Sequence, residues 1–237
     1  MKRLALLTWM TLSACGAPPP VVAADAGAWW DGALGSCLVQ AGEPPRTISQ
    51  MVERINALPR PVSVACVIAG LPRPLSVVAS TSVFSAQPAE GRRSPRIFIL
   101  NDALILSVVP EGTGAKLLEF GQVVTAGRTL KGELPFPVTG ALAPTAPFTQ
   151  VLMGTSQSNC GLCHRAESPH PTIADSFVSA AFKPDPGNLV PLSELRAEQR
   201  SCDPQTERPR CELLTALLAF GTVVDGKFPS QFELFIQ

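Results

Sequence analysis

Two thiols and an imidazole lie within five residues of this chain, at Cys160, Cys163 and His164. Cysteines three positions apart on a helical turn present both sulfurs to one side, and the adjacent imidazole then lies next to them. Thiolates and imidazoles bind metals, and a pair of thiols forms or exchanges a disulfide. These three residues are therefore the first candidate for a functional site, and the remaining segments have to position them.

The five-residue stretch Cys-Gly-Leu-Cys-His resembles the haem-attachment motif of c-type cytochromes. The resemblance implies one covalent haem c, with Cys160 and Cys163 bonded to its vinyl groups and His164 as the proximal iron ligand. Small soluble cytochromes c carry the motif near the mature amino terminus and take a second axial ligand from a downstream methionine. Here the motif comes late and no methionine follows it. The second ligand is expected to be His170 in preference to Met153, with a lysine or an open position as further alternatives.

Three other chemistries fit the same residues. Cys160 and Cys163 are also compatible with a structural disulfide, or with a redox pair similar to that of thioredoxins. A redox pair needs a strand directly before it and a helix after it, whereas a polar loop precedes this motif and Pro169 ends any helix early. Cys160, Cys163, His164 and His170 are also of the residue types that bind zinc. Cys163 and His164 are adjacent in the chain, however, so their side chains point in different directions, which makes joint ligation difficult.

The amino terminus carries an export signal. Residues 1–14 begin with Lys2 and Arg3, and an apolar run too short to span a bilayer follows. The Leu-Ser-Ala-Cys sequence that ends at Cys15 resembles the lipobox of bacterial lipoproteins. That resemblance implies cleavage before Cys15, its acylation, and a membrane tether on the periplasmic face of the cell envelope. By the same resemblance, Gly16 after the cysteine, in place of an acidic residue, implies the outer membrane in preference to the inner one.

The cysteines are even in number once Cys15 is set aside for the lipid. Free thiols are not expected to persist in an oxidising compartment, so the remaining cysteines should be paired or modified. If the two motif cysteines hold a haem, Cys37 with Cys66 and Cys202 with Cys211 remain as pairs that are close in sequence. We therefore expect these two disulfides.

The hydrophobic pattern predicts an α+β fold. Apolar residues at helical spacing and a capping box between Thr47 and Gln50 predict a helix over 47–58. Short apolar runs separated by turns then predict an antiparallel sheet, with Cys66 on a central strand. The expected strands cover residues 62–69, 75–80, 96–100, 104–109 and 117–124.

A proline-rich stretch at 135–147 marks the expected boundary between this sheet and a smaller, mostly helical, haem-binding region that resembles cytochrome c. Helices are expected there over 173–182, 192–200 and 211–220. The predicted organisation is a signal peptide over 1–14, a Pro/Ala-rich linker over 15–28, an α+β region over 29–143 and the haem-binding region over 144–237.

These features predict a lipid-anchored electron carrier with one haem c, which works with a redox partner protein that the sequence does not identify. Basic and acidic residues number 19 each, which argues against nucleic acid as a partner. We find no catalytic motif of the hydrolase, P-loop or zinc-protease type. The alternative is a non-enzymatic lipoprotein, stapled by disulfides, in which Cys160 and Cys163 form an ordinary bridge. The stretch 131–136, which mixes charged and apolar residues, has no role in either hypothesis.

Overall fold

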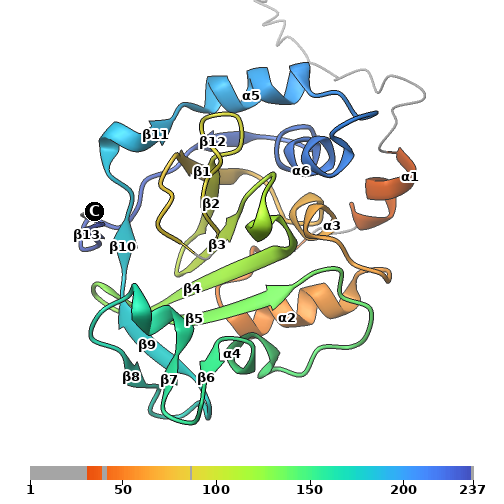
Figure 1. The fold of residues 1–237 in the computed structure, drawn as a ribbon. Coiled ribbons are helices and arrows are strands. Elements are labelled where there is room, and N and C mark those ends of the chain that lie inside the picture. Colours follow the sequence, from red (N-terminus) through yellow and green to blue (C-terminus); the bar gives the residue numbers. More distant parts are fainter. Residues whose placement is uncertain (1–30, 39–41, 86, 236–237) are drawn as a thin grey trace, which may run out of the picture.

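The computed structural model describes residues 31–38, 42–85 and 87–235 (Figure 1). The predicted signal peptide, the predicted linker and Cys15, the expected site of lipidation, lie outside the described residues. Among the helices in these ranges, none is both long and apolar enough to cross a membrane.

A large sheet, antiparallel except at one strand pair, forms the centre of the fold. Its strand order is β11-β1-β2-β3-β4-β5-β9-β8, and β12 pairs in parallel with β1. The strands are β1 (Leu75–Ser80), β2 (Arg96–Asn101), β3 (Leu104–Val108), β4 (Leu117–Thr125), β5 (Arg128–Pro135), β8 (Ser168–Pro169), β9 (Phe177–Ala180), β11 (Leu189–Val190) and β12 (Val223–Asp225). Two short pairs lie outside it, formed by β6 (Leu152–Met153) with β7 (Gln157–Ser158) and by β10 (Phe182–Lys183) with β13 (Glu233–Leu234).

Helices cover one face of the sheet and form the main core with it. They are α1 (Asp31–Leu34), α2 (Ile48–Ala57), α3 (Val64–Ala69), α4 (Ala146–Thr149), α5 (Leu192–Ser201) and α6 (Arg208–Leu218), with 3-10 turns η1 (Gly35–Cys37), η2 (Thr113–Lys116), η3 (Asn159–Leu162) and η4 (Pro186–Asn188). The buried side chains of α2, α3 and α6 pack with alternate residues of β1 to β5, such as Ile97, Leu106, Leu118 and Leu130. In Figure 1, α2 lies behind β4 and β5.

The intervening residues of the same strands point to the opposite face, because side chains alternate along a strand. A second, smaller apolar cluster forms there around Ile105, Ala181 and Phe232. The chain after β9 and the carboxy-terminal segment supply Ala181 and Phe232, so late parts of the sequence cover this face. It is the face that carries the candidate site.

The α+β prediction is confirmed, and so are the helix over 47–58 and both expected disulfides. The structure has α2 capped by Thr47, with the complete Thr47–Gln50 capping box. Disulfides join Cys37 to Cys66 and Cys202 to Cys211. The strands expected at 75–80, 96–100, 104–109 and 117–124 are present as β1 to β4, and the helices expected at 192–200 and 211–220 are present as α5 and α6.

The expected strand over 62–69 is wrong, because that run forms the helix α3 and carries Cys66. The Ser63 side chain accepts a hydrogen bond from the Cys66 N–H at the start of α3, and every residue of α3 is buried. A run that is apolar on all sides has no periodicity, so pattern alone does not separate a buried helix from a buried strand.

The expected mostly helical region over 144–237 is not confirmed, because the described residues of this range form strands as well as helices. Between α4 and α5 the chain forms short strands and 3-10 turns, and the helix expected over 173–182 is the strand β9. Here β9 pairs with β5, while β11 and β12 pair with β1, so strands from this part of the chain extend the same sheet. Pairing with strands distant in sequence is a tertiary effect that local propensity does not contain.

Candidate functional site

A cavity of about 540 Å³ lies over the second face of the sheet, between β2 to β5 and the segments that cover them. Every second residue of these strands points to the floor of the cavity. One row across the sheet consists of Phe98, Ser107, Glu119 and Glu133, each paired with the next on the neighbouring strand. In the next row Ile105 pairs with Gly121, which pairs with Lys131. Gly121 leaves the middle of the floor without a side chain. The apolar lining is rich in phenylalanine, namely Phe84, Phe98, Phe120, Phe182, Phe228, Phe232 and Phe235.

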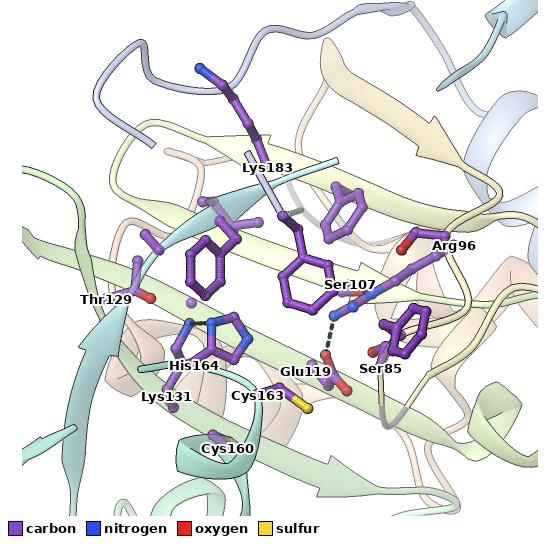
Figure 2. A pocket seen from close by; sticks show the side chains of 18 of the residues that line it. Ser85, Arg96, Ser107, Glu119, Thr129, Lys131, Cys160, Cys163, His164 and Lys183 are labelled. Carbon is purple, nitrogen blue, oxygen red and sulfur yellow. Dashed lines mark hydrogen bonds and ion pairs between the residues drawn. The ribbon is translucent and has the colours of Figure 1, made fainter. Parts of the chain in front are cut away.

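The Cys-Gly-Leu-Cys-His stretch forms one wall of this cavity (Figure 2). It is a single helical turn, in which the N–H groups of Cys163 and His164 both donate to the Cys160 carbonyl oxygen, at 3.2 and 2.8 Å. Glu167, which follows the turn, is bonded to Ser158, which precedes it. The Glu167 carboxylate accepts hydrogen bonds from the N–H and the hydroxyl of Ser158, at 2.8 and 2.5 Å. The structure therefore brings together the three residues that the motif predicted.

The position of Gly161 within this turn is explained by Glu167. A Cβ atom at Gly161 would lie 2.7 Å from Oε1 of Glu167, which is too close for two non-bonded atoms. Since the Glu167 carboxylate is already bound to Ser158, glycine is the residue that fits without displacing it.

The imidazole of His164 has its proton on Nδ1. This nitrogen lies 2.8 Å from the Ala180 carbonyl oxygen, which only accepts, so Nδ1–H must be the donor. Burial, followed by the charge of Lys131, lowers the pKa of His164 to about 3, and the ring is neutral at physiological pH. Phe182 stacks on the ring at 5.4 Å between centroids. Nε2 thus keeps its lone pair, and it makes no hydrogen bond to any described residue.

Lys131 lies beside His164 on the cavity side of β5. Its Nζ atom is 3.2 Å from the protonated Nδ1 of His164. An ammonium group has no lone pair, so Lys131 accepts a hydrogen bond from Nδ1–H only as a neutral amine. Burial lowers the pKa of Lys131 to about 8, which makes the neutral form accessible. Burial also raises the pKa of Glu133, two residues along the strand, to about 7, with a smaller effect from Glu119. Both side chains are buried without an ion pair between them.

An ion pair crosses the floor farther from His164. Arg96 on β2 is paired with Glu119 on β4, and its Nε donates to the Ser107 hydroxyl at 2.7 Å. The guanidinium also lies 4.8 Å from the centre of the Phe98 ring. Figure 2 shows Arg96 and His164 reaching into the cavity from different sides. The cavity therefore combines aromatic walls with fixed polar groups, a composition typical of sites for small molecules and cofactors.

The two motif cysteines are free thiols, unlike the other four described cysteines. Burial raises the pKa of the Cys160 thiol to about 11, with Lys131 opposing part of that effect. An exchange-active cysteine has its pKa lowered by its surroundings, so Cys160 is in the wrong environment for a thioredoxin-type nucleophile.

The zinc site considered from the sequence is not assembled. Across the described residues, one group of three metal-ligating side chains has its ligand atoms within 4.8 Å of one another, namely Cys202, Glu207 and Cys211. The two sulfurs of that group are bonded to each other in a disulfide, so they are not available to a metal. Zinc held by the motif together with His170 would need His170 near Cys160, which the structure does not provide.

Both residues expected as second iron ligands lie outside the cavity lining. His170 follows β8 at the far edge of the sheet, and its Nδ1 accepts hydrogen bonds from the N–H groups of Thr172 and Ile173, at 3.3 and 3.2 Å. Met153 is in the short β6–β7 pair and is 38% exposed. The sequence distances allowed either residue to reach the motif, but strand pairing holds both of them elsewhere.

Sequence reasoning missed the polar floor of the cavity. Thr129, Lys131 and Glu133 alternate along β5, which ends at Pro135 and so includes all but the last residue of the stretch 131–136, for which the sequence suggested no role. The alternation of charged with apolar residues was the available signal, because it is what a strand shows when its two faces have different surroundings.

Comparison of the chain with protein-family models, with curated proteins and with solved structures finds no match.

Proposed function

We propose that this chain is a lipid-anchored carrier of one covalent haem c, which passes single electrons on the periplasmic face of the cell envelope. Cys160 and Cys163 are the attachment thiols, His164 is the proximal iron ligand, and acylated Cys15 is the membrane tether. One observation carries the proposal. An unprotonated Nε2 on His164 faces a cavity of about 540 Å³ whose wall bears two free thiols.

The residues around the cavity fit such a group. The volume lies within the range of roughly 300–1,000 Å³ that is typical of ligand sites, and phenylalanine rings supply apolar walls for a flat macrocycle. Gly121 adds room at the floor. His164 meets the requirement for an axial ligand, because the bond from Nδ1 to Ala180 fixes the tautomer and directs the basic nitrogen away from the backbone.

A haem bound here would supply a reversible one-electron couple, and the surrounding residues set the conditions for it. The aromatic walls limit access of water, while the ion pair of Arg96 with Glu119 contributes fixed charges. The Ala180 carbonyl holds the imidazole by one hydrogen bond and Phe182 holds it by stacking. These contacts hold the His164 imidazole in one orientation, as a ligand of such a haem would need.

The mouth of the cavity is open to a partner protein. Three apolar lining residues are strongly exposed, with Leu162 at 75%, Phe84 at 55% and Val83 at 54%. Aromatic contacts connect this rim to the proposed ligand: His164 packs on Phe182, Phe182 packs on Phe235 at 5.4 Å, and Phe235 packs on Phe84 at 6.2 Å. An exposed apolar rim of this kind is typical of a contact surface, and it supports electron passage to a docked partner.

The test is a pyridine haemochrome spectrum together with a haem-stained denaturing gel, on protein exported in a host that has the haem-attachment machinery. We expect a covalent haem signal in the wild type and its loss in the Cys160→Ser, Cys163→Ser double variant. Leu162→Ala is the matched control, because Leu162 lies in the same turn but is exposed and has no attachment role. Wild-type protein without haem, or equal staining of the double variant, would refute the proposal.

A further inference from the structure

We infer that the chain supplies His164 as its one axial ligand and leaves the opposite coordination position open to a small diatomic molecule. This inference rests on the proposed haem site and specifies what that site binds. It follows from where the structure places every side chain that is able to compete for that position.

Histidine and methionine are the usual second ligands of a c-type haem, and the candidates are few. Beyond the predicted cleavage site, the chain contains one further histidine, His170, and two methionines, Met51 and Met153. All three lie within the described residues. His170 and Met153 lie away from the cavity, as shown above, and Met51 is fully buried in the main core on the other face of the sheet. None of them lines the cavity.

Lysine is the next possible ligand, and two lysines line the cavity. Lys131 contacts Nδ1 of His164, so it lies beside the proximal ligand instead of opposite Nε2. Lys183 directs its side chain away from the cavity in Figure 2, and its Nζ donates to the Ser230 carbonyl oxygen at 3.3 Å. The chain contains no tyrosine.

Two carboxyl groups lie on the floor of the cavity. Glu119 accepts from Arg96 in an ion pair, and Glu133 is its cross-strand neighbour on β5, so both belong to the sheet side of the cavity. The rest of the lining is mainly phenylalanine, with the Arg96–Glu119 ion pair and the hydroxyl groups of Ser85, Ser107 and Thr129 among the rings. Those surroundings favour a small uncharged ligand, and the polarity and access of the distal pocket decide what a haem binds.

The test uses the exported, haem-loaded protein and begins with its haemochrome spectrum, which establishes whether haem is present. The ferric spectrum and its magnetic-resonance signal are then recorded, and the ferrous protein is titrated with carbon monoxide. We expect a five-coordinate, high-spin iron, and we expect carbon monoxide to bind rapidly in a single phase. The variants His170→Gln, Met153→Leu and Lys183→Met should give the same spectra and the same binding rate as the wild type.

Three results would overturn the inference. A loaded protein with a low-spin, six-coordinate iron would contradict it and leave the proposed haem site standing. A spectrum that becomes high-spin in only one of the three variants would do the same and would identify that residue as the second ligand. A protein without any covalent haem would overturn both proposals, and the haemochrome spectrum separates that outcome from the others.

Discussion

The Nδ1 atom of His164 lies 2.8 Å from the carbonyl oxygen of Ala180, and this single contact determines what the imidazole is able to do. It fixes the proton on the nitrogen that points toward β9 and leaves the other nitrogen basic. Because β9 pairs with β5, the position of Ala180 is set by the sheet and not by the loop that carries the motif. The N–H of Ala180 also donates to the Arg165 carbonyl oxygen at 2.9 Å, which ties the end of the motif to the same strand.

Replacement of His164 tests its proposed role as the proximal iron ligand. In His164→Ala the thioether bonds should still hold the haem, but the absorption spectrum should change because the axial nitrogen is gone. Imidazole added to the buffer should occupy the space that the side chain has left, so the variant spectrum should then match that of the wild type recorded in the same imidazole buffer. His170→Ala is the control and should leave the spectrum unchanged, since His170 lies outside the cavity. A His164→Ala protein with the wild-type spectrum would show that another residue ligates the iron.

Gly161 gives a test of the turn itself. Gly161→Ala places a Cβ where the Glu167 carboxylate lies, so at least one hydrogen bond from Ser158 to Glu167 should break. We expect a loss of about 1–3 kcal/mol in the free energy of unfolding and a smaller fraction of haem-loaded protein. Urea unfolding and the ratio of haem to protein absorbance measure the two effects. Gly140→Ala is the control, because a Cβ there meets nothing within 4 Å. Equal effects of the two substitutions would rule out this role for Gly161.

The turn also illustrates what could and could not be predicted from sequence. The motif identified its three side chains by spacing alone, and the capping box identified α2, because both are local patterns. The rest of the site depends on register: Glu119 faces Glu133, and Gly121 faces Lys131, only once β4 and β5 are aligned. A shift of one residue would move all four to the other face of the sheet. The partner of Nδ1 is a backbone carbonyl sixteen residues after His164, and no side-chain pattern identifies it.

The buried carboxyl of Glu133 predicts a pH dependence of stability. Its pKa is raised to about 7 from an ordinary 4.5, so the folded protein binds this proton more tightly than the unfolded chain. The resulting stabilisation is present below pH 4.5 and is lost as the pH rises to 7. Glu133→Gln keeps the shape without the charge, and at pH 8 it should be more stable than the wild type by about 1–3 kcal/mol.

Urea unfolding at pH 4 and pH 8 measures this difference, which should nearly vanish at the lower pH, where Glu133 is protonated. The matched control is Glu53→Gln on the exposed side of α2, which makes the same substitution without removing a buried carboxyl. A Glu133→Gln protein that is less stable than the wild type at pH 8 would mean that the ionised carboxylate is favoured in the folded state.

Arg210 tests the packing that supports the sheet away from the site. Its side chain is 2% exposed and is paired with Glu198, with Glu207 at 2.8 Å and with Glu111 at 3.5 Å. Arg210→Met leaves these carboxylates without their shared cation, and we expect a loss of about 3–5 kcal/mol in the free energy of unfolding. Thermal or urea unfolding measures it, and haem attachment in the protein that folds should be unaffected.

The control for this prediction is Arg208, two residues earlier on α6. It is 61% exposed and paired with Glu212, so Arg208→Met should cost about 0.5 kcal/mol or less. If both arginine variants lose the same small amount of free energy of unfolding, the buried ion pairs of Arg210 do not stabilise the fold more than the exposed pair of Arg208 does.

Covalent haem at the motif is measured most directly by mass spectrometry of the tryptic peptide Gly132–Arg165, taken from exported protein without reduction. This peptide contains Cys160, Cys163 and no other cysteine. We expect it to carry the mass of one haem, added without loss of hydrogen from the thiols. If the same peptide is instead two hydrogens lighter, as a disulfide between Cys160 and Cys163, the chain does not carry haem at these thiols, and the alternative of a disulfide-stapled lipoprotein is favoured.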